Sequence, residues 1–188
     1  MKKIFALILA SVMVFALAAC TRPEENLTLG GTLKKQFVEI TDGGETDPYT
    51  IAETLMTNPA IEFMPMVTEI DPGIFLQGFT LDEVTGFEKG AMFGPMIGSI
   101  PFIGYIFSLS EDADIDGFIN TLTENADLRW NICVSADEMH TEKSGTTVFF
   151  LMSPLSLEQE VPEENQEDVM DMPIDELPGD EPAAMPAE

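Results

Sequence analysis

The hydrophobic positions after residue 26 follow two periods, one helical and one typical of strands. Apolar side chains first recur at intervals of four, four and three residues, at Leu29, Leu33, Phe37 and Ile40. This spacing predicts a helix over residues 32–41. Gly43-Gly44 stands where that helix would end, and Gly30-Gly31 weakens the turn before it, because glycine lowers helix stability.

Two further helices are predicted from their start signals. Asp47-Pro48 combines an N-cap acceptor with a proline suited to the first turn, and Asn58-Pro59 marks the end of that helix. The segment 112–127 begins with acids, which the helix dipole favours at that end. Its apolar side chains share one helical face: Phe118, Ile119, Leu122 and Ala126.

Between and after these helices the period shortens to that of strands. Short apolar or alternating runs, bounded by turn residues, cover the ranges 61–68, 74–80, 128–134 and 146–152. The last of these is the clearest strand, since it is rich in β-branched and aromatic residues. Asp137 to Lys143 is predicted to be a charged connection, and Ser144-Gly145 a turn.

The segment 90–110 has 21 residues and no charge. Its length alone suits a membrane-spanning helix, but glycine and proline recur throughout it, and each internal proline costs a helix about 3 kcal/mol. Two buried strands joined by a tight loop fit this composition better. Membrane insertion and an apolar binding loop are the alternatives. The loop interpretation singles out Pro95, Met96, Ile97, Ile100, Pro101 and Phe102.

Together these elements predict an α+β fold with a mainly antiparallel sheet and about three helices. Residues 27–157 are enough for a single domain with its own core. The chain contains twelve methionines, and filling of that core explains them more simply than binding of Cu(I) does.

Residues 158–188 have a different composition. They hold twelve acids, no base and five prolines. We predict a disordered acidic tail, because this segment can bury too little apolar surface to offset the entropy lost on ordering. Its simplest role is that of a soluble, repelling segment, and the alternative is capture of cations or of a basic partner.

The first nineteen residues form an export signal in three parts. Lys2 and Lys3 precede an apolar run that extends to Leu17, and two alanines stand before Cys20. This layout resembles the lipoprotein signal of bacteria, with Leu17-Ala18-Ala19-Cys20 as the lipobox. The resemblance implies cleavage between Ala19 and Cys20, acylation of Cys20, and a tether over residues 20–26. Thr21 in place of Asp resembles the outer-membrane sorting pattern of hosts with two membranes.

A transmembrane anchor and an ordinary cleaved signal are the other interpretations of this segment. Its apolar run has only about 14 residues, whereas a spanning helix needs roughly 20. An ordinary signal would not need Cys20. We therefore expect an exported protein, lipid-anchored at the cell membrane or the outer membrane. Its expected partners are the bilayer, through acylated Cys20, and an unknown protein or small ligand.

The net negative charge of the chain limits which other partners it can bind. Removal of residues 1–19 takes away two lysines and no acids, which changes the net charge from −26 to −28. Nucleic acid is excluded as a partner, because affinity for it depends on Lys and Arg side chains that neutralise phosphates. Attraction of the protein's own charge to anionic lipid is disfavoured for the same reason, so the covalent lipid is the expected anchor.

The segment Asp112-Ala113-Asp114-Ile115-Asp116-Gly117 resembles the first half of an EF-hand-type calcium loop. Carboxylates at positions 1, 3 and 5 can surround a hard cation, Gly at position 6 permits a sharp turn, and Asn120 falls at position 9. The pattern then fails, because Thr123 occupies position 12 and Glu124 comes one residue late. A helix N-cap with an acidic first turn is the alternative. Calcium at Asp112, Asp114, Asp116 and Asn120 is a secondary hypothesis, and no other cofactor is expected.

Cys133 and His140 are the remaining candidates for chemistry. A thiol nucleophile with a histidine base would make the protein an envelope hydrolase. With Cys20 acylated, however, Cys133 has no partner for an intramolecular disulfide. Beside Trp130 and Ile132 it is more simply a small buried hydrophobic side chain. The sequence favours a non-enzymatic binding or interaction module, with calcium binding and hydrolysis as alternatives.

Overall fold

The computed structural model describes residues 27–131 and 133–157. The predicted lipobox and the predicted disordered tail lie outside this range. The described helices are α2 (Leu29–Asp42), α3 (Pro48–Leu55) and α4 (Ile115–Asn125). The described strands are β1 (Pro65–Ile70), β2 (Lys89–Pro95), β3 (Ile103–Ser108), β4 (Glu138–Ser144) and β5 (Thr147–Ser153). The predicted α+β class, with three helices and an antiparallel sheet, is confirmed.

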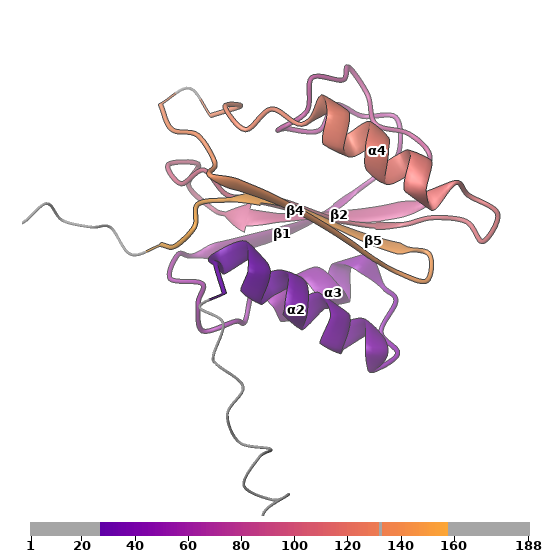
Figure 1. The fold of residues 1–188 in the computed structure, drawn as a ribbon, viewed down its shortest axis with the longest axis horizontal. Helices are drawn as coiled ribbons and strands as arrows, with labels where there is room; N and C mark the ends of the chain where they lie inside the picture. The colour runs from indigo at the N-terminus through magenta and orange to yellow at the C-terminus, as the bar shows by residue number, and fades with distance from the viewer. Residues whose placement is uncertain (1–26, 132, 158–188) are drawn as a thin grey trace, which may run out of the picture. The chain divides into compact units, whose positions relative to one another are not determined.

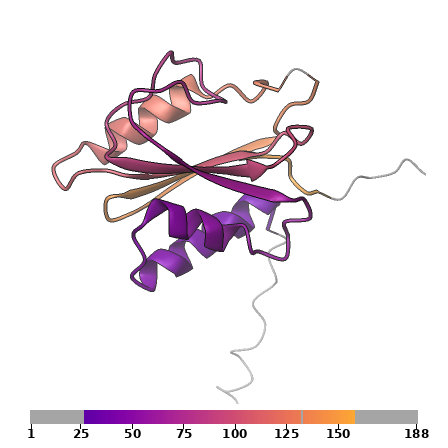
Figure 2. The same cartoon turned by 180° about the vertical axis from the view of Figure 1, so that it is seen from behind.

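The five strands form one sheet in the order β1-β2-β3-β5-β4, and every neighbouring pair is antiparallel. Helices α2 and α3 cover one face of this sheet (Figure 1). Helix α4 and the long connection between β1 and β2 cover the other face, as the reverse view also shows (Figure 2). The central strands β3 and β5 are therefore buried on both sides, and every residue of β5 is buried.

Each face of the sheet has its own core, because successive side chains of a strand point to opposite faces. On the α2 and α3 side, the rings of Phe37 and Phe149 lie 5.3 Å apart between their centroids. On the α4 side, Phe150 packs against Phe79 with centroids 4.9 Å apart. The clear strand predicted at 146–152 thus supplies both cores.

The uncharged segment 90–110 forms β2, a loop and β3, so the prediction of two buried strands is confirmed. None of the described helices is long and apolar enough to cross a membrane. Gly104 is one of the glycines that recur in this segment. It lies within β3 opposite Phe93, whose buried ring occupies the place where a side chain would stand.

Other predictions in the strand regions are wrong. Residues 74–80 form turns with isolated bridges, and the described residues 128–131 and 133–134 belong to no strand. The predicted charged connection from Asp137 to Lys143 is instead most of strand β4. Strand β4 pairs along its whole length with β5, and as an edge strand it keeps polar side chains on its partly exposed positions. The polar composition of this segment therefore gave no sign of a strand.

Helix α2 begins three residues before the predicted start. The side chain of Thr28 accepts a hydrogen bond from the backbone N–H of Gly31 at 3.1 Å and so caps the helix. Gly30 lies directly beneath the ring of His140 in β4, where a Cβ atom would overlap that ring. Glycine is present here because the helix and the edge strand approach so closely.

Candidate functional site

One end of the sheet gathers several chain segments that are distant in sequence. The register pairs Pro65 with Pro95 at this end. It also places the start of β3 beside the end of β5, and the start of β4 opposite Ser153. Helix α2 begins at the same end, because the N–H of Leu29 donates to the carbonyl of Leu155 at 2.9 Å. The described chain therefore both starts and finishes here, on the left of Figure 1.

Most of the exposed large hydrophobic side chains lie at this end. We call them the apolar end: Leu27, Met64, Met66, Met96, Ile97, Val134 and Leu155. Ile97 is 75% exposed and Met64 is 68% exposed, values expected for charged surface residues. The expectation that methionines fill the core is therefore wrong for the three that belong to this group. Exposed apolar side chains gathered at one end of a fold make that end a candidate contact surface.

The loop between β2 and β3 forms the tip of the apolar end. Of the residues proposed for an apolar binding loop, Met96 and Ile97 are exposed and Phe102 is buried, while Pro95, Ile100 and Pro101 are half-buried. The loop is held on two sides. The N–H of Met96 donates to the carbonyl of Met64 at 2.9 Å, and the Asn131 side chain donates to the carbonyl of Gly98 at 2.9 Å. The exposed side chains thus stand on a braced loop.

A small pocket lies behind this loop, between Met66, Phe102 and Trp130. Its volume is about 60 Å³. Pockets that enclose small organic ligands usually have several hundred Å³, on the order of 300 to 1,000. The apolar end is therefore better suited to contact with a surface than to enclosure of a ligand.

The residues of the predicted calcium loop have other partners in the structure. Asp114 caps α4, since its carboxylate accepts from the N–H of Gly117 at 2.9 Å, as the N-cap alternative predicted. The carboxylate of Asp116 is paired with Lys143 of β4. Asp112 and Asn120 are exposed. Among the described residues, no group of three or more His, Cys, Asp or Glu side chains is placed to hold a metal ion.

Cys133 and His140 are not brought together. Cys133 is exposed, so the expectation that it is buried is wrong. It lies in the loop between α4 and β4, whose Trp130 packs into the core on the α4 side of the sheet. The ring of His140 lies over Gly30 of α2, on the opposite side. With the sheet between them, this cysteine and histidine do not form a nucleophile and its base.

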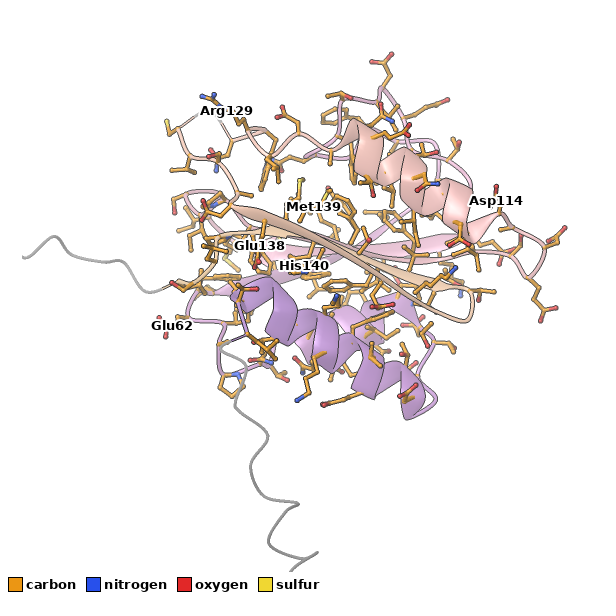
Figure 3. All side chains as sticks on the ribbon, viewed as in Figure 1. Glu62, Asp114, Arg129, Glu138, Met139 and His140 are labelled. Carbon is orange, nitrogen blue, oxygen red and sulfur yellow. The ribbon has the colours of Figure 1, made fainter. Side chains whose placement is uncertain are left out.

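His140 belongs instead to a polar cluster that sequence reasoning missed. Its Nε2 lies 2.8 Å from Oε2 of Glu138 (Figure 3). The other carboxylate oxygen of Glu138 accepts from the N–H of Gly30 at 2.9 Å and from the hydroxyl of buried Ser153 at 3.2 Å. Burial alone would raise the pKa of Glu138, but hydrogen bonds from His140, Thr28 and Gly30 outweigh it and hold this pKa below its ordinary value.

The cluster joins the first turn of α2 to the start of β4. A carboxylate at a helix N-terminus is favoured there by the dipole and by the free N–H groups. Because the oxygens of Glu138 are engaged by these donors, the arrangement is that of a structural clamp. Glu138 and His140 are two residues apart in strand β4 and so share one face of it. The prediction of a connection for this segment gives no such face.

The chain was compared with known proteins at three levels. No family model, no curated protein and no solved structure matches it.

Proposed function

We propose that this protein is an exported lipoprotein, anchored in a membrane of the cell envelope through acylated Cys20, whose folded domain is a non-enzymatic interaction module. The observation that carries the proposal is Leu17-Ala18-Ala19-Cys20 at the end of an apolar run with a basic start. Two or more acyl chains on one residue hold a protein stably on a bilayer, whereas one chain holds it only marginally.

The apolar end is the interaction surface in this proposal. It gathers exposed Met, Ile, Leu and Val side chains from five separate segments of the chain. The segment that follows Cys20 enters the domain at Leu27, which is itself a member of this group. The proposed anchor is therefore only seven residues from this surface along the sequence.

Acylation is tested by expressing the full chain in bacteria that are fed a labelled fatty acid. Cys20→Ser is compared with Cys133→Ser, the matched control that removes the chain's other cysteine. We expect the wild type and Cys133→Ser to carry the label and to sediment with membranes, and Cys20→Ser to lose both properties. A wild-type chain without label, or a labelled Cys20→Ser chain, would reject the anchor.

A further inference from the structure

We infer that the apolar end rests against the same bilayer that holds Cys20, with the exposed loop between β2 and β3 entering the interfacial layer. This deepens the proposed function by naming the partner of its surface, and it rests on the anchor proposed there. The chemistry of the partner is that of a zwitterionic phospholipid surface. The contact is made by apolar side chains and not by charge attraction.

The tether between Cys20 and the domain is short. Cys20 precedes Leu27 by seven residues, and a fully extended chain of that length spans at most about 24 Å. Leu27 lies at the apolar end, next to the Leu29–Leu155 hydrogen bond. The anchored residue is therefore tied to this end of the domain, and α2, 14 residues or about 21 Å long, leads away from it.

Charge is unevenly distributed along the domain. Acids gather around the opposite end of the sheet: Asp42, Glu45, Asp47, Glu69, Asp71, Glu88, Glu111, Asp112, Asp114 and Asp116. The apolar end has fewer charged groups: Glu62, Arg129, Asp127, Asp137 and Glu138. Figure 3 shows Glu62 and Arg129 at one end of the domain and Asp114 at the other. Charged groups avoid the apolar interior of a bilayer, so this polarity favours the apolar end facing the membrane.

The loop between β2 and β3 is uncharged and carries exposed apolar side chains. Residues 96–102 contain no charge, and Met96 and Ile97 project from a backbone held by hydrogen bonds to Met64 and Asn131. Apolar side chains of this kind can enter the boundary between headgroups and acyl chains by roughly 5–10 Å. In the sequence, Leu157 is followed by residues 158–188, which hold twelve acids. Anionic lipid should therefore weaken the contact.

A second copy of the chain, or residues 158–188, could cover the same surface instead. The test must separate these occupants and must not depend on acylation by cells. The mature chain, residues 20–188 with Cys133→Ser, is coupled through the thiol of Cys20 to a maleimide lipid in phosphatidylcholine vesicles. A single tryptophan then reports its surroundings: Trp130→Phe removes the native one, and Ile97→Trp or Asp112→Trp places another at either end of the domain.

Quenching by brominated phosphatidylcholine is the measurement. We expect the Ile97→Trp emission to be quenched roughly threefold more than that of Asp112→Trp, since the interfacial layer is only about 10 Å deep. Quenching of Ile97→Trp should fall when anionic phosphatidylglycerol is included. Circular dichroism of each variant before coupling confirms that it is folded.

Three results would overturn the inference. Equal quenching at both positions, or none at either, would mean that this end does not face the bilayer. A blue shift at position 97 that depends on protein density and not on brominated lipid would identify a second copy. A blue shift without vesicles that disappears when residues 158–188 are deleted would identify that segment. Because the coupling is chemical, none of these results depends on the fatty-acid labelling, so the anchor and the contact can fail separately.

Discussion

Gly104→Ala tests the packing of the β2–β3 hairpin that carries the exposed loop. Gly104 lies opposite Phe93, and an added Cβ would stand 2.7 Å from Cε1 of that ring and closer still to Cζ and Cε2. Favourable carbon contacts lie near 3.5–4.0 Å. Phe93 has no exposed surface, and its centroid is 6.1 Å from that of Phe102 and 6.3 Å from that of Phe149, so the ring has little room to move.

Overpacking of a well-filled core costs about 1–3 kcal/mol, and the loss of glycine's freedom in the unfolded chain returns about 0.4–1 kcal/mol. We therefore expect Gly104→Ala to lower the free energy of unfolding by about 1–2 kcal/mol. For a chain of this size each kcal/mol shifts the melting temperature by roughly 3–5 °C, so the midpoint should fall by roughly 3–10 °C. Thermal and urea unfolding, followed by circular dichroism on the mature chain, measure both values.

Gly98→Ala is the matched control within the same hairpin. A Cβ at Gly98 meets no atom within 4 Å, and its φ is not among the positive values. This variant should be as stable as the wild type or slightly more stable. If Gly104→Ala unfolds at the same temperature as Gly98→Ala, Phe93 does not occupy the space above Gly104 and the packing described for this hairpin is wrong.

Three further outcomes are expected from unfolding measurements. The pKa of Glu138 is lowered in the folded protein, so this carboxylate stabilises the fold above its ordinary pKa of 4.5, and the stabilisation is lost as pH falls through the folded pKa. The difference in unfolding free energy between wild type and Glu138→Gln should therefore shrink below pH 4.5. A difference that stays constant with pH would contradict the clamp. Tyr105→Phe should lower the free energy of unfolding in urea by about 1–2 kcal/mol, because the buried hydroxyl of Tyr105 donates to the carbonyl of Gln77 at 2.7 Å. Burial also raises the pKa of Tyr105, so the hydroxyl keeps its proton. An unchanged urea midpoint would mean that this bond does not hold the β1–β2 connection. Asp114→Ala should lower the free energy of unfolding by about 1 kcal/mol through loss of the α4 cap, equally with and without calcium. A loss of stability that appears only with calcium would support the metal hypothesis.

The contrast between β5 and β4 shows where sequence reasoning succeeded in the fold. Strand β5 was predicted because its β-branched and aromatic residues need burial on both faces, a property visible in the strand itself. Strand β4 has a polar sequence and is a strand only because β5 offers it a full set of hydrogen-bonding partners. No local pattern reports such pairing, so the segment looked like a connection.

The candidate site divides in the same way. The predicted lipobox at Cys20 is a local signal, read from adjacent residues and independent of any fold. Met96 and Ile97 were singled out as part of an apolar loop, but the same loop contains buried Phe102, and sequence could not separate them. Exposure depends on which neighbours the fold supplies, and these come from distant segments.

The sequence alone was enough to predict several local properties: the α+β class, the capped starts of α3 and α4 and the uncharged hairpin. Each follows from residues within a few positions of one another, where caps, periodicity and composition act directly. Only the tertiary structure decided that Leu27, Met64, Ile97 and Leu155 share one end of the sheet, and that Glu138 clamps α2 to β4. The antiparallel register brings those residues together, and register is set by long-range pairing and burial, which no single segment encodes.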